Sequence, residues 1–201
     1  MDVYMIRHGQ STANLDMTHS GWSPVSLTEK GRRQAEETRD IISHIQFDKL
    51  FVSDVLRAQQ TAEIIFPNTP RTFTALTREL DNTTMKGKTK DEMYALYGEL
   101  YIECRSNFSY APLGIDCESL EHLAARAAAF FKYLEGFSHL KRVAAVSHAG
   151  FIMSMAAHTL GIEKHPRPLM CENASVSVFR LNEWGWRVRA WNITPDVINP
   201  L

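Results

Sequence analysis

Short apolar runs alternate along the chain with segments whose apolar residues recur every three or four positions. The runs are typical of buried strands, and the longer periodic segments are typical of amphipathic helices. The expected strands are residues 3–6, 49–52, 71–75 and 142–147, followed by a terminal hairpin of 176–180 and 186–191. The expected helices are 29–45, a helix capped by Ser53 or Asp54 that stops before Pro67, a long helix capped by Ser119, and 149–160 closed by Gly161.

This order of elements predicts an α/β fold. Strands that alternate with helices form a mostly parallel sheet covered on both faces, a three-layer α/β/α sandwich. The length of 201 residues fits one domain over residues 1–201. In such sheets, ligands bind at the carboxyl ends of the strands.

The periodicity changes between residues 80 and 112, which we interpret as a small helical lid inserted into the main fold. Apolar positions there predict one helix, carrying Met93, Leu96, Tyr97, Leu100 and Tyr101. Lysines at 86, 88 and 90 give this lid cations that could meet a second anionic group on a substrate. Loops at the rim of a site tend to carry specificity.

Composition narrows the possible partners and the compartment. Lys and Arg total 22 and Asp and Glu total 23, so no overall charge favours nucleic acid or an anionic membrane. No apolar run approaches about 20 residues, and the N-terminus turns charged too early for a signal peptide. The cysteines Cys104, Cys117 and Cys171 are too few and scattered for a disulfide framework, so we expect a cytoplasmic protein with free thiols. The sequence does not indicate an oligomeric state.

Three predicted strands end on residues that can bind and attack a phosphate group. Arg7 and His8 follow the first, Arg57 lies in the first turn after the second, and His148 follows the longest apolar strand. A guanidinium and helix N–H groups together favour an anion. Two arginines and an imidazolium would neutralise phosphate oxygens, and a second, neutral imidazole could act as nucleophile. The histidines lack metal-ligand spacing, so we expect neither a metal nor another cofactor.

Several runs resemble the histidine phosphatase superfamily, in its phosphoglycerate mutase-like branch. Residues 5–14 read Met-Ile-Arg-His-Gly-Gln-Ser-Thr-Ala-Asn, and 53–62 read Ser-Asp-Val-Leu-Arg-Ala-Gln-Gln-Thr-Ala. Further matches are Leu-Thr-Glu-Lys-Gly at 27–31, Glu-Ser-Leu at 118–120, Val-Ser-His-Ala-Gly at 146–150 and Asn-Ala-Ser at 173–175. The resemblance covers nearly the whole chain in the family's order.

This resemblance implies a role for each candidate residue. His8 would be the phosphorylated nucleophile. The phosphoryl oxygens would be held by Arg7, Arg57 and His148, with Asn14 assisting. Glu79 occupies the place of the proton donor, and Asp81 is the reserve choice.

Some positions depart from the family pattern and leave the substrate open. Met-Lys-Gly at 85–87 replaces a frequent Trp-Glu-Gly, and Cys117 replaces the usual glycine before Glu118. We expect a metal-independent phosphoric monoester hydrolase that acts on a small phosphorylated metabolite. One alternative is a cofactor-dependent phosphoglycerate mutase, although true mutases carry a longer segment between the acid and the second histidine. The other is a non-catalytic module that binds phosphoproteins.

Overall fold

A six-stranded sheet forms the centre of the protein. The computed structural model describes residues 1–107, 110–162 and 169–198. The strands are β1 (Asp2–Arg7), β2 (Lys49–Ser53), β3 (Arg71–Thr74), β4 (Arg142–Ser147), β5 (Val176–Asn182) and β6 (Gly185–Ile193). They lie in the order β3-β2-β4-β1-β5-β6. The first four run parallel, and β5 and β6 form the antiparallel hairpin at one edge.

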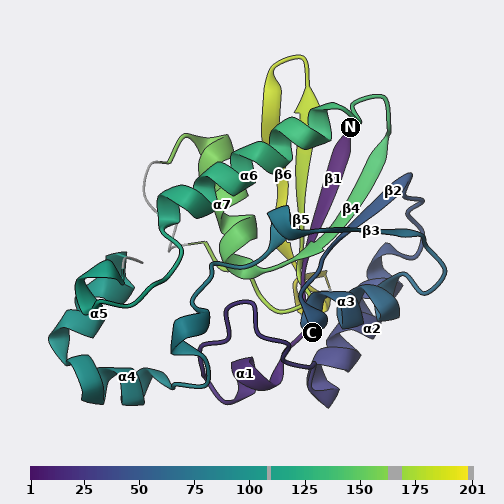
Figure 1. The fold of residues 1–201 in the computed structure, drawn as a ribbon. Coiled ribbons are helices and arrows are strands. Elements are labelled where there is room, and N and C mark those ends of the chain that lie inside the picture. Colours follow the sequence, from purple (N-terminus) through teal and green to yellow (C-terminus); the bar gives the residue numbers. More distant parts are fainter. Residues whose placement is uncertain (108–109, 163–168, 199–201) are drawn as a thin grey trace.

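Helices cover both faces of this sheet, which confirms the predicted α/β architecture (Figure 1). The helices α6 (Leu120–Glu135) and α7 (Ala149–Leu160) pack on the face that carries Val3, Met5 and Phe51. The helices α2 (Glu29–Ile42) and α3 (Leu56–Ile65) pack on the opposite face, beneath alternate residues of the same strands. Successive side chains of a strand point to opposite faces, so β1, β2 and β4 each contribute to both cores. Short elements complete the order, namely α1 (Thr12–Leu15), η1 (Ala75–Thr77) and α8 (Pro195–Ile198).

The capping residues explain most helix boundaries. The hydroxyls of Thr28 and Ser119 accept from N–H groups in the first turns of α2 and α6, as expected. The predicted cap of α3 is wrong, because this helix begins after Val55 without a side-chain cap. The side chains of Ser53 and Asp54 are engaged elsewhere, in contacts with the candidate site and its rim. Helix α2 ends at Ile42, three residues before the expected end, and α1 was not expected.

The segment predicted as a lid leaves the main fold after Asp81 and returns at Glu118, whose N–H donates to the Asp81 carbonyl, and it contains two helices rather than one. Gly98, with φ of +57°, separates α4 (Lys90–Tyr97) from α5 (Glu99–Asn107), and η2 (Thr83–Met85) and η3 (Ala111–Leu113) flank them. The break turns Leu96 and Leu100 outward, so the single apolar stripe predicted from the sequence does not form. A separate small core holds this segment together, made by Met85, Met93, Tyr101, Cys104 and Tyr110. Figure 1 shows α4 and α5 projecting away from the sheet.

The start of α2 lies directly against the loop that follows β1. A Cβ atom at Gly31 would lie 2.0 Å from the carbonyl oxygen of Gln10, and one at Gly9 would lie 2.2 Å from the carbonyl oxygen of Gly31. The backbone N–H of Thr28 also donates to the Gln10 carbonyl at 2.9 Å. His8 lies in the chain between the end of β1 and this closely packed loop. The close approaches therefore fix its position.

We therefore expect Gly31→Ala to destabilise the protein although it lies in a helix. Alanine ordinarily favours a helix over glycine by about 1 kcal/mol. Here the new methyl group meets backbone atoms that cannot rotate away, and overpacking costs about 1–3 kcal/mol. Urea unfolding of Gly31→Ala and of the exposed neighbour Lys30→Ala measures the difference. A free energy of unfolding equal to or above that of wild type in Gly31→Ala would contradict the proposed close packing.

Candidate active site

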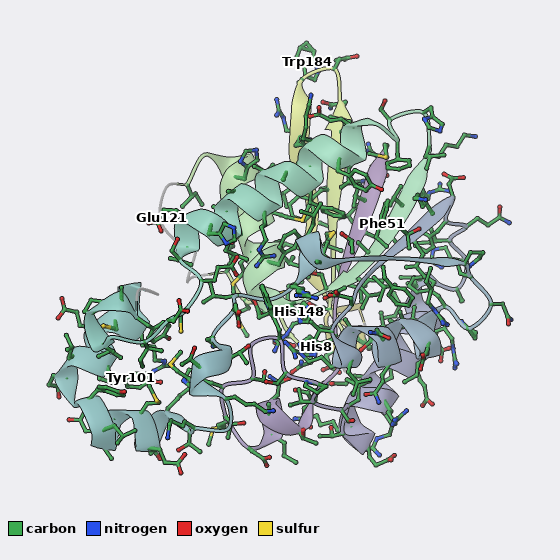
Figure 2. All side chains as sticks on the ribbon, in the orientation of Figure 1. His8, Phe51, Tyr101, Glu121, His148 and Trp184 are labelled. Carbon is green, nitrogen blue, oxygen red and sulfur yellow. The ribbon has the colours of Figure 1, made fainter. Side chains whose placement is uncertain are left out.

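Neighbouring strands place the candidate residues at one edge of the sheet. Arg7 at the end of β1 is in register with Ser147 at the end of β4, and β2 flanks β4 on its other side. The N–H of His8 donates to the Ser147 carbonyl at 3.0 Å. The rings of His8 and His148 consequently meet edge to face, with centroids 5.1 Å apart. Figure 2 shows both histidines together at the carboxyl ends of the central strands.

Two hydrogen bonds fix the tautomer of His8. Its Nδ1 lies 2.7 Å from the carbonyl oxygen of Gly9, which can only accept. Its Nε2 lies 3.0 Å from Nε of Arg57, which can only donate. Nδ1 therefore carries the proton and Nε2 presents a lone pair.

The surroundings of His8 also oppose a second proton. Burial lowers the pKa of His8 well below its usual 6.5, and the charges of Arg57 and Arg7 lower it further. The Gly9 carbonyl acts in the opposite direction but is the weakest of these influences. His8 is thus a neutral imidazole with an available nitrogen, the form that a nucleophile requires.

His148 lies behind His8 and is fully buried. Its Nε2 is 2.8 Å from the hydroxyl oxygen of Ser53, and its Nδ1 is buried without a hydrogen-bond partner in the structure. Burial lowers the pKa of His148 well below 6.5, with further contributions from Arg57, His8 and Arg7. A buried imidazole nitrogen without a partner is costly, which is consistent with a ligand completing its hydrogen bonds.

Two arginines lie beside these rings, Arg57 buried and Arg7 partly buried. The side chain of Arg57 is 2% exposed, and its Nη2 donates to the Gly21 carbonyl at 3.0 Å. Burial lowers the pKa of Arg57 to about 10, which leaves the guanidinium charged at neutral pH. Arg7 donates from Nη1 to the Cys171 carbonyl at 2.5 Å, while its Nε is buried and unpartnered.

Glu79 faces the same site from the loop after η1. One carboxylate oxygen accepts from the N–H of Leu80 at 2.9 Å, and the other from the N–H of Gly150 at 3.1 Å. The Glu79 carboxylate therefore lies at the start of α7, where free N–H groups favour an anion. Asp81 does not line the cleft, because its carboxylate accepts from the N–H and hydroxyl of Thr83. The geometry favours Glu79 over the reserve residue.

Asn14 reaches the site from α1. Its side-chain oxygen accepts from both the N–H and the hydroxyl of Ser11, and from the amide of Asn173 at 3.2 Å. These contacts engage the oxygen, so the amide N–H₂ group is what Asn14 can offer to an anion.

These groups line a cleft of about 570 Å³ at the carboxyl edge of the sheet. Arg7, His8, Asn14, Arg57 and Glu79 all contribute to its wall, whereas His148 lies just behind it. The loop after α1 and the lid supply a polar wall, with His19, Ser20, Asn82, Arg105 and Ser106. Leu80, Leu120, Leu123 and Met153 form an apolar wall.

The lid lysines do not contribute to this cleft. Lys86, Lys88 and Lys90 are exposed and are absent from its lining, while Arg105 on α5 is part of it. The lid cation at the cleft is therefore a different residue from the three expected ones, and it lies on α5.

Sequence reasoning also missed two residues that hold Glu79. Trp22 donates from its indole nitrogen to the Glu79 carbonyl at 2.7 Å, and Arg126 on α6 donates to the same oxygen at 3.1 Å. One signal for Arg126 was present in the sequence. It falls three positions after Leu123 and one before Ala127, which places a charge on the inward face of a predicted amphipathic helix.

Neither a metal site nor a membrane-spanning helix is found among the residues that the structure describes. In the part of the chain that the structure describes, no group of three or more His, Cys, Asp or Glu side chains is arranged to hold a metal ion. Over the same residues, no helix combines the length and apolar character needed to cross a membrane.

A mostly parallel α/β sandwich with two histidines and two arginines around an anion-sized site defines a phosphate-processing enzyme. Comparison with known protein families identifies the particular group. The family model described as histidine phosphatase superfamily (branch 1) matches residues 3–194, so the chain belongs to this family. The expectation of an enzyme of the histidine phosphatase superfamily is confirmed with it.

Individual relatives include both phosphatases and mutases. The chain is 25% identical to adenosylcobalamin/alpha-ribazole phosphatase of Escherichia coli (strain K12), over 81% of this chain and 80% of the relative. It is 30% identical to the 2,3-bisphosphoglycerate-dependent phosphoglycerate mutase of Bradyrhizobium sp. (strain BTAi1 / ATCC BAA-1182), over 76% of this chain and 78% of the relative. The solved structure of a mycobacterial glucosyl-3-phosphoglycerate phosphatase superposes with a TM-score of 0.84 at 25% identity. The superposition covers 96% of this chain and 99% of that phosphatase.

The two buried imidazoles predict how stability depends on pH. Both have folded-state pKa values below the 6.5 of an ordinary histidine, so unfolding takes up protons below that pH. The stability that they contribute is complete above pH 6.5 and is lost as the pH falls through 6.5 toward their folded-state pKa values. We expect the thermal unfolding midpoint of the wild type to decrease as the pH is lowered from 6.5 to about 5. Each histidine changes the free energy of unfolding by up to about 1.4 kcal/mol per pH unit.

Thermal unfolding of His148→Asn, compared with the exposed control His139→Asn, measures this dependence. The slope of the unfolding midpoint against pH, below pH 6.5, should be smaller in His148→Asn than in wild type and unchanged in His139→Asn. Equal slopes in all three proteins would show that His148 is not a neutral buried imidazole.

Proposed function

We propose that this protein hydrolyses a phosphate monoester with His8 as the nucleophile and Glu79 as the proton donor. The observation that carries the proposal is the neutral His8, whose Nε2 lone pair is directed at Arg57 in the wall of the cleft. In this proposal Arg7 and Arg57 bind the phosphoryl oxygens, His148 donates through Nδ1, and Asn14 donates through its amide.

Binding of the ester exchanges one hydrogen bond for another. Arg57 donates to His8 Nε2 in the structure without ligand. When the phosphoryl group enters, its oxygens take over the guanidinium N–H groups, and the lone pair of His8 is released for attack. The buried nitrogens of Arg7 and His148 that lack partners gain acceptors in the same step.

The chemistry then proceeds in two displacements. Nε2 of His8 forms a bond to phosphorus while the bond to the leaving oxygen breaks, and protonated Glu79 gives that oxygen its proton. The imidazole then carries a positive charge, which the Gly9 carbonyl stabilises through Nδ1–H. Water next attacks phosphorus, Glu79 accepts its proton, and the bond between nitrogen and phosphorus breaks to restore His8.

The cleft supports an amphipathic leaving group. Its apolar part would rest against Leu120, Leu123 and Met153, and its hydrogen-bonding part would face the lid, near Asn82 and Arg105. The relatives named above act, by their names, on phosphorylated metabolites of this general kind. Free thiols at all three cysteines support our proposal of a reducing, cytoplasmic location.

Mutase activity is the second candidate, since one relative with 30% identity is a phosphoglycerate mutase. Hydrolysis is favoured because the solved phosphatase and this chain cover each other almost completely, at 96% and 99%. The two chains are therefore of similar extent, which supports a phosphatase. Incubation with 3-phosphoglycerate and 2,3-bisphosphoglycerate distinguishes the two, since a hydrolase releases inorganic phosphate and a mutase yields 2-phosphoglycerate.

We expect His8 to carry the phosphoryl group during turnover in the presence of excess EDTA. Base quenching preserves phosphohistidine, and mass spectrometry locates it. His8→Ala should lose both the label and the turnover of 4-nitrophenyl phosphate, whereas Ser11→Ala, next to the site, should keep the label. A label on Ser11 or Ser53, or activity that requires an added divalent cation, would overturn the proposal.

We expect Glu79→Gln to discriminate between leaving groups. An alkoxide needs a proton as it departs and a nitrophenolate hardly does, so kcat/KM, which reports the first displacement, should fall by about 10²–10⁴ on alkyl phosphates and far less on 4-nitrophenyl phosphate. The matched control is Asp81→Asn, which should lose rate equally on both. Selective loss in Asp81→Asn alone would transfer the role of acid to Asp81.

A further inference from the structure

The loop that carries Glu79 depends on a buried ion pair outside the cleft. Arg126 of α6 and Glu118 have side chains only 11% and 3% exposed. The two form a bidentate contact, with Nε to Oε1 at 2.7 Å and Nη2 to Oε2 at 2.6 Å. Neither residue lines the cleft, so neither touches the substrate in the proposed reaction.

The guanidinium of Arg126 also binds the backbone of this loop. Its Nη1 donates to the carbonyls of Leu76 at 2.8 Å and Arg78 at 2.9 Å, and its Nη2 donates to the Glu79 carbonyl at 3.1 Å. Strand β3 ends at Thr74, so these carbonyls have no partner strand and need other donors. One side chain supplies a donor to all three.

Glu118 holds the other side of Glu79. Its Oε2 accepts from the N–H of Asp81 at 3.1 Å, and its own N–H donates to the Asp81 carbonyl at 2.8 Å. The backbone is thereby fixed immediately before and after Glu79. The carboxylate itself is held by the N–H groups of Leu80 and Gly150.

A buried ion pair is weak support for stability alone, because desolvation offsets much of the attraction. This pair instead fixes the point at which an acid must meet a leaving oxygen, where an error of about 1 Å is costly to the rate. We propose that Glu118 and Arg126 are positioning residues, which act through the placement of Glu79. This inference rests on the assignment of Glu79 as proton donor.

The test compares Arg126→Lys with a matched control, Arg180→Lys. Arg180 makes a similar bidentate pair with Asp2, at the start of β1 and far from the carboxyl edge. Lysine keeps the charge of Arg126 but cannot reach both the carboxylate and three carbonyls. We expect kcat/KM on an alkyl phosphate to fall at least 10-fold in Arg126→Lys, with less than a 3-fold change on 4-nitrophenyl phosphate. Arg180→Lys should change neither by more than about 2-fold.

A double variant separates positioning from a structural role. If Arg126 acts through Glu79, the variant Arg126→Lys/Glu79→Gln should be no slower on alkyl phosphate than Glu79→Gln alone. The inference would be overturned if the rate losses of the two single variants multiplied in the double variant. It would also be overturned if Arg126→Lys lost rate equally on both substrates. Glu118→Gln supplies a second variant with the same expected pattern, which decides the question should Arg126→Lys fold poorly.

The outcome for Glu79 is independent of this result. Equal losses of Glu79→Gln on both substrates would refute the proposed acid itself. A selective loss in Glu79→Gln together with uniform losses in Arg126→Lys and Glu118→Gln would refute only the positioning role.

Discussion

The site depends on keeping one imidazole uncharged beside two charged guanidinium groups. His8 is buried against Arg57 and Arg7, whose charges disfavour a proton on its ring, while the Gly9 carbonyl fixes the single proton on Nδ1. This arrangement stores unfavourable repulsion between cations and leaves buried polar nitrogens without partners. In the proposed function a phosphate dianion would relieve both, so these costly features are the ones that would bind it.

The same cations attract the proposed acid. The Glu79 carboxylate favours the charged forms of Arg7 and Arg57. A bound phosphate would compete for that positive charge. Because these attractions vary with distance, they require a fixed Glu79 backbone. Arg126, Glu118 and Trp22 provide such a backbone.

The rigid sheet and the lid divide the work between them. The phosphoryl-binding groups come from strand ends and helix starts that share two large cores on either face of the sheet. The lid has a small core of its own around Tyr101 (Figure 2) and contributes Arg105, Ser106 and Tyr110 to the cleft. Changes in the lid can therefore alter the leaving group that fits, with little effect on the groups at phosphorus.

The sequence by itself determined the elements and the residues that gather at the proposed site, because strand periodicity, Thr28 and Ser119 caps and strand-end residues are local signals. It could not determine which lid residues line the cleft, since the expected single helix is divided at Gly98, with its φ of +57°, and Arg105 of the second half lines the cleft. It placed Glu79 ahead of Asp81 by resemblance alone, and the contact of Glu79 with Gly150, 71 residues away in the chain, supports that order. Those choices belong to the tertiary structure, because they depend on distances between residues that lie far apart in the chain or on the conformation of one turn.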